Sequence, residues 1–190
     1  MTTEDQFTFL ATIPGIILGL AVVQILNGLA NILQNIRSVR TYWVHSIWMF
    51  ILGLALIQHW YVLYSWRDFG SNIVSYIFFM LYPINLFIAS ALLVPQIGKN
   101  EEVDLKEHYY SKHKLFFGMM TLLMIESIAR TTVLGRSNFF AVDTLYRLVG
   151  FSLFCALFLS KNKRLHSAAA LVTTCLFTAF IVQFSFKLAH

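Results

Sequence analysis

Charged residues are scarce in this chain. Asp, Glu, Lys and Arg make up 12% of its 190 residues, against about 25% in an ordinary soluble domain. Hydrophobic residues make up 58% of the chain, and the mean hydropathy is +0.68. This composition excludes a soluble globular protein and leaves no room for a sizeable soluble domain beside the apolar segments.

Cysteine is also rare. Cys155 and Cys175 both lie inside long apolar stretches, where free, buried cysteines are more typical than disulfides. The spacing of zinc-binding cysteines is absent, and His108 and His113 are five residues apart, which does not place them on one helical face. We therefore expect no metal site and no cofactor. The opening residues MTTEDQFTFL lack the basic segment and cleavage site of a signal peptide.

Long apolar runs are the main feature that the sequence does contain. A run of about 18 or more apolar residues with few charges predicts a helix that crosses a membrane. The chain is expected to be all-α, a single transmembrane domain over residues 1–190 with six helices in one bundle. Their expected ranges are about 8–35, 42–65, 73–95, 114–134, 141–160 and 166–187, with a cytoplasmic lead-in helix at about 100–113.

The basic residues between these runs predict an orientation. Nine lysines and arginines fall on one side of the six spans and three on the other. Because cytoplasmic loops are enriched in Lys and Arg, both termini are expected outside, and the segment from Lys99 to Lys114 in the cytoplasm. The expected location is a cell membrane, most simply a bacterial inner membrane. The net charge of +5 then belongs to these loops, and no nucleic-acid partner is expected.

The first apolar run carries a stripe of amides. Gln24, Asn27, Asn31 and Asn35 fall within an arc of roughly 80° on a helix that turns about 100° per residue. Amides inside a bilayer need hydrogen-bond partners. The stripe therefore predicts a polar cavity or, alternatively, hydrogen bonds that join helices. Interhelical hydrogen bonds average well under about 1 kcal/mol, which favours the cavity.

A face of small residues lies elsewhere on the same run. Ala11, Gly15 and Gly19 would let another helix approach closely. A homo-oligomer joined through this face is one possible assembly, in addition to the lipid bilayer as the surrounding partner.

Four ionisable residues lie within the fourth and fifth runs. Glu126 and Arg130 are four residues apart, and so are Asp143 and Arg147, so each pair shares a helical face. In an antiparallel hairpin Glu126 comes level with Arg147, and Arg130 with Asp143. We expect these cross-hairpin pairs to form a neutral charge network in the outer half of the membrane. A purely structural staple between the two helices is the alternative.

Further polar residues fall at similar depths in the second and third runs. Gln58 and His59 lie in one, and Tyr82 and Asn85 flank Pro83 in the other. Intramembrane polar groups are costly and are functional candidates. The residues expected to line a polar cavity are Gln24, Asn27, Asn31, Gln58, His59, Tyr82 and Asn85.

Three functions fit these patterns. The first is a membrane protein that transports, conducts or senses a small solute or ion through an outward cavity. The second is a non-catalytic subunit or anchor that assembles partner proteins. The third is a haem-binding electron carrier, because His45 and His59, at a 14-residue spacing, resemble the paired ligands of cytochrome b-type helices. Nucleophile and phosphate-loop motifs are absent, so an enzyme is the less favoured class.

Overall fold

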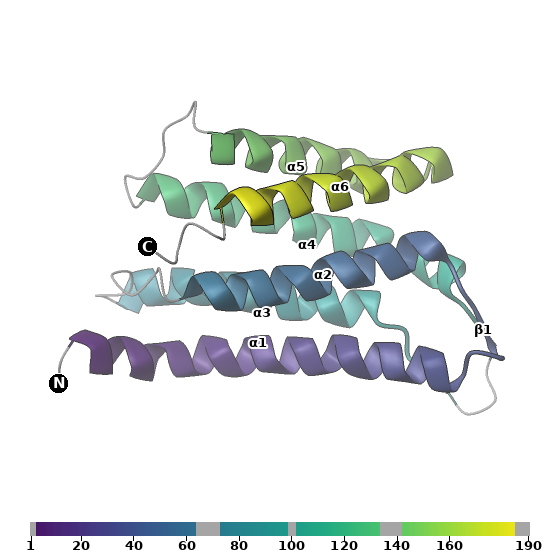
Figure 1. The fold of residues 1–190 in the computed structure, drawn as a ribbon, viewed down its shortest axis with the longest axis horizontal. Coiled ribbons are helices and arrows are strands. Elements are labelled where there is room, and N and C mark those ends of the chain that lie inside the picture. Colours follow the sequence, from purple (N-terminus) through teal and green to yellow (C-terminus); the bar gives the residue numbers. More distant parts are fainter. Residues whose placement is uncertain (1–2, 64–72, 99–101, 134–141, 185–190) are drawn as a thin grey trace.

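The structure is a computed structural model, and it describes residues 3–63, 73–98, 102–133 and 142–184. Within these residues it contains six helices, which run side by side along one direction (Figure 1). They are α1 (Thr3–Gln34), α2 (Trp43–Val62), α3 (Ile73–Leu93), α4 (Leu105–Val133), α5 (Val142–Leu159) and α6 (Lys163–Phe184). The predicted all-α, six-helix membrane bundle is confirmed.

Five of the described helices are long and apolar enough to cross a membrane, namely α1, α2, α3, α5 and α6. Their outer sides carry large apolar residues such as Ile16, Phe50 and Leu159, which are more than half exposed. Such side chains suit lipid rather than water. α4 lies between α3 and α5 and carries the ionisable residues described below.

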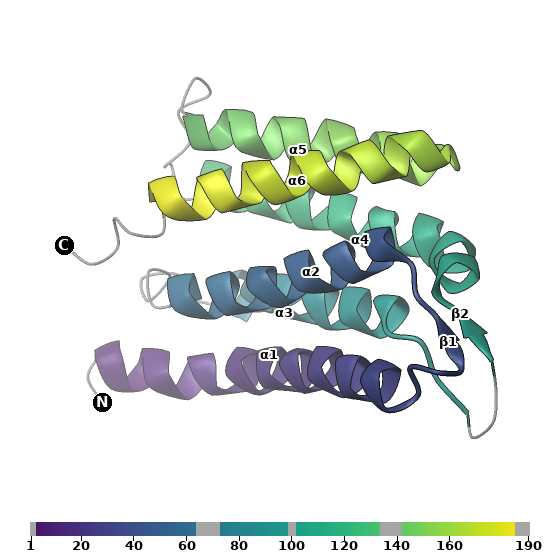
Figure 2. The same cartoon turned by 45° about the vertical axis from the view of Figure 1, so that its right-hand side comes forward.

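The helices form a closed ring. The order around the ring is α1, α3, α4, α5, α6, α2 and back to α1, and α2 also touches α3 and α4 across the ring. α1 begins and α6 ends at the same end of the bundle, and the α1–α2 connection lies at the other end (Figures 1 and 2). The ring order brings α2 against α6, far from it in sequence.

A short parallel strand pair closes one end of the bundle. β1 (Val39–Arg40) pairs with β2 (Val103–Asp104) in the register Val39 to Val103, which Figure 2 shows beside the start of α4. Arg40 and Glu102 approach to 3.8 Å but both are largely exposed, so their ion pair contributes little stability. The backbone pairing itself joins the α1–α2 connection to the start of α4.

α4 joins the expected lead-in helix and the expected fourth span in one continuous helix, which begins at Leu105 rather than at about residue 100. Residues 105–117, on both sides of the expected boundary, contain neither glycine nor proline to interrupt it. Asp104 caps its start, where Oδ1 accepts hydrogen bonds from the backbone N–H groups of Lys106 and Glu107, at 2.8 and 3.3 Å. Asn100, the predicted cap, lies outside the described residues.

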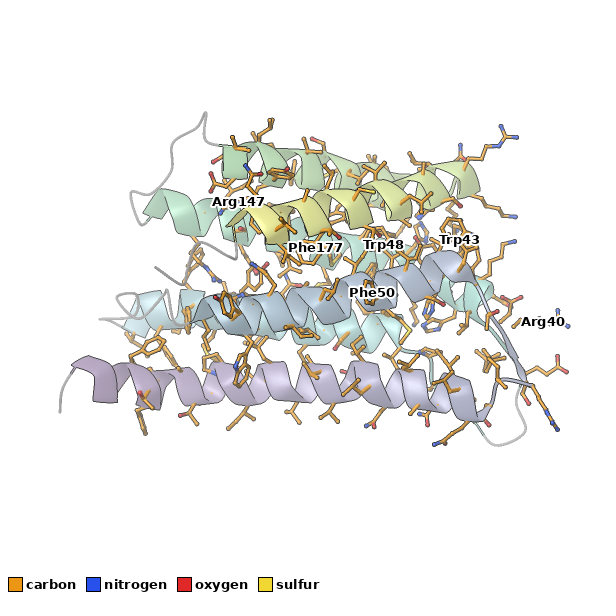
Figure 3. The ribbon with its side chains drawn as sticks, in the orientation of Figure 1. Arg40, Trp43, Trp48, Phe50, Arg147 and Phe177 are labelled. Atoms are coloured by element: carbon orange, nitrogen blue, oxygen red, sulfur yellow. The ribbon has the colours of Figure 1, made fainter. Side chains whose placement is uncertain are left out.

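An aromatic core lies between α2, α4 and α5. Trp48 is fully buried and meets Phe116, Phe117 and Phe154 edge to face, with ring centroids 5.0 to 6.0 Å apart. Edge-to-face contacts suit the quadrupoles of aromatic rings. This aromatic core, labelled at Trp48 in Figure 3, separates two polar regions at different depths.

Candidate functional site

A hydrogen bond joins α3 to α4 inside the bundle. Asn85 Nδ2 donates to Glu126 Oε1 at 3.5 Å, and both side chains are buried. Asn85 is roughly 12 Å along α3 from its end at Leu93 and roughly 18 Å from its start at Ile73. An acid and an amide therefore meet well inside the bundle, away from either membrane surface.

Tyr82, one helical turn from Asn85, is the centre of the same region. Its ring stacks on the His59 ring of α2, with centroids 4.3 Å apart and planes 19° apart. The Arg130 guanidinium carbon lies 4.8 Å from the Tyr82 ring centroid, in a cation–π contact. His59, Tyr82, Asn85, Glu126 and Arg130 together form what we call the interior polar cluster, built from α2, α3 and α4.

This cluster is almost completely removed from the surface. The exposed fractions of His59, Asn85, Glu126 and Arg130 are 3%, 2%, 6% and 3%. Ionised groups in such surroundings are tolerated only where opposite charges and hydrogen bonds compensate them. Glu126 and Arg130 interact electrostatically, so the acid and the base offset each other's charge.

Asp143 and Arg147 form an ion pair next to this cluster. Their oxygen and nitrogen atoms are 3.1 Å apart, within one turn of α5. Arg147 lies near the end of the bundle opposite Arg40 (Figure 3) and interacts electrostatically with Tyr82 and Arg130. The structure thus brings all four predicted ionisable residues into one region, and the ion pair that it records for Asp143 is with Arg147 of the same helix. The predicted pairs across the hairpin stay a prediction.

Glu126, Asn85 and His59 each have a buried polar atom with no hydrogen-bond partner within the described part of the chain. These atoms are Glu126 Oε2, Asn85 Oδ1 and His59 Nε2, one from each of the three helices. A buried polar atom without a partner costs about 1–3 kcal/mol, and more where it is charged. These three atoms are therefore available to a bound ligand or to water.

The polar stripe of α1 does not join this cluster. Gln24 is half-buried and its Oε1 accepts a hydrogen bond from Ser90 of α3 at 3.1 Å. Asn27 and Asn31 are exposed on the outer side of α1, and Asn35 Nδ2 donates to the backbone oxygen of Asn31. Their side chains point outward because the inner face of α1 is taken by a buried apolar set, namely Leu18, Ala21, Ile25 and Ile32.

Gln58 was predicted to line the cavity, and Gly15 and Gly19 were predicted to form the small-residue face. Gln58, next to His59 in α2, is half-buried. A Cβ at Gly15 would lie 3.3 Å from the Trp60 ring of α2, so this glycine already serves packing within the chain. A Cβ at Gly19 would meet nothing within 4 Å, which leaves that position open on the surface.

A second polar region, which sequence reasoning missed, lies at the end that carries β1 and β2. His45 Nε2 is 2.8 Å from the backbone oxygen of Leu93, and the His108 ring interacts electrostatically with the backbone of Leu92 and Leu93. Two histidines from α2 and α4 thus hold the end of α3. Burial lowers the pKa of His108 below its usual range, so its neutral form is the one that suits this place.

α6 joins this end through a chain of hydrogen bonds. The Tyr109 hydroxyl lies 2.7 Å from His166 Nδ1, and His166 Nε2 lies 2.8 Å from the backbone oxygen of Ser160. Burial raises the pKa of Tyr109, so the phenol stays protonated and can donate to the imidazole. Among the described residues, His, Cys, Asp and Glu form no group of three or more suited to a metal ion.

The residues expected to hold haem fit that role poorly. An axial haem ligand needs a free imidazole nitrogen and space for the macrocycle beside it. His59 Nε2 has no partner among the described residues, but its ring is buried and stacked on Tyr82, and His45 Nε2 is engaged by the Leu93 backbone oxygen. The described geometry therefore gives the electron-carrier interpretation little support.

Comparison with known proteins gives no family. The chain matches no protein-family model, no curated protein and no solved structure. Its function has to be inferred from the interior polar cluster, the membrane-type bundle around it and the exposed amides of α1.

Proposed function

We propose that this membrane protein binds a small solute or ion at the interior polar cluster, and that it transports, conducts or senses this ligand. One observation carries the proposal: Glu126, Asn85 and His59 each keep a buried polar atom without a partner among the described residues. Buried polar atoms are normally satisfied, and exceptions call for an explanation. A ligand or ordered water between α2, α3 and α4 supplies one.

Energetics favour this function over a purely structural role. A charged residue within a span costs about 2.5–3.5 kcal/mol on insertion scales. A staple between two helices needs an acid on one helix and a base on the other, whereas the close Asp143–Arg147 pair lies within α5. The second acid and base, Glu126 and Arg130, are buried more deeply and add to that cost, which is reasonable where they contact a ligand.

A second candidate function is a subunit that assembles with another membrane protein. Asn27 and Asn31 support it, because both amides are exposed on the outer side of α1. An amide that faces lipid lacks hydrogen-bond partners, and an amide on an adjacent protein would provide them. This function predicts a partner on α1 and requires no ligand in the interior polar cluster.

Ligand-induced stabilisation tests the first proposal. Purified protein in detergent is heated in the presence of a panel of inorganic salts and small organic acids, amines and sugars. A ligand at 100 times its dissociation constant stabilises a protein by about 2.7 kcal/mol, which raises the unfolding temperature measurably. Glu126→Gln should abolish or alter the response, whereas Glu102→Gln, a change at an exposed carboxylate, should leave it intact. A panel without any response in the wild type contradicts the proposal.

A further inference from the structure

We propose that the ligand of the interior polar cluster is a small monovalent anion that binds together with one proton. This inference rests on the proposed function and names its ligand class. The anion takes the place of the Glu126 carboxylate as the counter-charge of Arg130, and a proton from a hydronium ion or buffer acid of the solvent binds Glu126 Oε2. The bond between this proton and its donor breaks, the new O–H bond on Glu126 forms, and the net charge of the cluster stays the same.

Arg130 is the fixed member of the pair. Its guanidinium carbon lies 4.8 Å from the centroid of the Tyr82 ring and 5.9 Å from that of Phe79, so two rings of α3 hold the cation in place. Guanidinium groups are also charged at every physiological pH. A positive charge therefore persists in the cluster whatever happens to the carboxylate beside it.

Glu126 is the member that can be neutralised. Oε1 accepts one long hydrogen bond, 3.5 Å from Asn85 Nδ2, and Oε2 has no partner within the described residues. A carboxylate that is meant to stay ionised in a buried place usually accepts several short hydrogen bonds. Here a proton on Oε2 would break no hydrogen bond that the structure records.

The neighbouring charged groups do not take over the role of Glu126. Asp143 is bound to Arg147 at 3.1 Å within α5. Arg147 adds a second positive charge within electrostatic range of Tyr82 and Arg130. When Glu126 is protonated, the two arginines are faced by Asp143 as the one remaining carboxylate in the described part of this region, so the cluster gains a net positive charge that attracts an anion.

Donors for an anion are present in the same place. Protonation of Glu126 weakens its hold on the amide Nδ2 of Asn85, which then has an N–H group to offer. His59 Nε2 is buried and without a partner among the described residues, and it becomes a donor in the tautomer that carries its proton there. Arg130, Asn85 and His59 thus converge from α4, α3 and α2.

A metal cation fits the cluster less well. Glu126 Oε2 and Asn85 Oδ1 are oxygen atoms of the type that Na⁺ or Ca²⁺ prefers. However, Glu126 and Arg130 share a face one turn apart on α4, so a cation on these oxygens would lie beside a guanidinium in surroundings of low dielectric constant. Repulsion there is strong, whereas a proton on Glu126 and an anion on Arg130 avoid it.

Calorimetric titration of the purified full chain tests this inference. The probes are choline chloride, which offers chloride with a bulky cation, and sodium gluconate, which offers sodium with a bulky anion. Titrations in two buffers that differ in ionisation enthalpy give the number of protons taken up per ion bound. We expect chloride to bind with about one proton, and its affinity to rise about tenfold for each unit by which pH falls while Glu126 is mainly ionised.

Four variants separate the roles. Glu126→Gln imitates the protonated acid, so it should bind chloride with no proton uptake and little pH dependence. Arg130→Gln should lose chloride binding, and Arg130→Lys, which keeps the charge, serves if the glutamine variant does not fold. Glu102→Gln, at an exposed site, should behave as the wild type.

Three outcomes would overturn the inference while leaving the proposed small-ligand site in place. Saturable binding of sodium but not of chloride, lost in Glu126→Gln, contradicts the anion while leaving the proposed small-ligand site in place. Chloride binding that involves no proton in the wild type contradicts the coupling. A wild type that binds neither ion in calorimetry yet responds to another solute in the thermal panel also refutes the inference alone. If no solute stabilises it either, the proposed function fails with it.

Discussion

His59 and Tyr82 stack face to face, with ring centroids 4.3 Å apart and ring planes 19° apart. This contact joins α2 to α3 and positions Tyr82 for the cation–π contact with Arg130 of α4. Three helices therefore meet at one aromatic ring, and the polar atoms that we assign to ligand binding surround it. The predictions below test this geometry and the packing that supports it.

Tyr82→Leu should destabilise the protein by about 1–2 kcal/mol, because it removes both the stacked contact and the cation–π contact. Tyr82→Phe keeps the ring and should cost clearly less. Thermal unfolding of the two variants in the same detergent provides the measurement. Equal losses in both would show that the ring contacts do not carry the stability.

Asp143→Asn should destabilise the bundle by about 1–3 kcal/mol, because it leaves Arg147 without the carboxylate 3.1 Å away. The double exchange Asp143→Arg with Arg147→Asp should recover most of that loss. Arg40→Gln is the matched control, since the Arg40–Glu102 pair is exposed and should contribute almost nothing. A double exchange that is less stable than both single changes would contradict the pairing within α5.

Gly28→Ala should destabilise the contact between α1 and α3. A Cβ at this position would lie 2.7 Å from a methyl carbon of Val94, and overpacking of a tight contact typically costs about 1–3 kcal/mol. Val94→Ala in the same chain should relieve the clash. Gly19→Ala, where a Cβ meets nothing within 4 Å, should be tolerated, and a similar loss at both glycines would refute this packing.

Acidification should weaken the hold of His108 on the end of α3. Burial lowers the pKa of His108 in the folded protein, so the unfolded chain binds more protons and stability falls as pH drops below the unfolded value of about 6.5. His108→Gln removes this contribution. The unfolding temperature should therefore fall less between pH 7.5 and 5.5 in His108→Gln than in the wild type, and an equal or larger fall in the variant would contradict the assignment.

The predicted orientation stays a prediction that labelling can check. Nine of the basic residues between the spans lie on the side that carries Arg37, Arg40 and the start of α4, which predicts a cytoplasmic location. Glu102→Cys lies on that side and is exposed in the structure. An impermeant thiol reagent should not label this cysteine in intact cells and should label it after lysis. Labelling in intact cells would contradict the predicted orientation and place both termini in the cytoplasm.

The sequence predicted every residue of the interior polar cluster, because polar groups are conspicuous in apolar runs. His59, Tyr82, Asn85, Glu126 and Arg130 all follow from their depth in the runs and from the cost of burying them there. Their partners were harder to predict. Residue spacing determines which residues share a helical face but not the direction in which that face points. The spacing of Asp143 and Arg147 was therefore compatible both with their contact within α5 and with pairs across the hairpin.

The stripe on α1 illustrates the same limit. Gln24, Asn27 and Asn31 do share one side of the helix, but spacing alone does not distinguish a side that faces the interior from one that faces outward. The histidines at the other end were missed for a different reason. His45, His108 and His166 come from α2, α4 and α6, and their proximity depends on the ring order of the helices, for which the sequence contains no pattern.

Reagent access to Asn85 tests the central claim most directly. In a chain whose two cysteines are replaced by serine, Asn85→Cys and Leu86→Cys place one thiol each at adjacent buried positions of α3. If the interior polar cluster admits solutes, a small charged methanethiosulfonate should modify Asn85→Cys in membranes and leave Leu86→Cys unmodified, because Leu86 belongs to the apolar core. Equal inertness at both positions would show a dry interior and contradict a ligand site at Glu126.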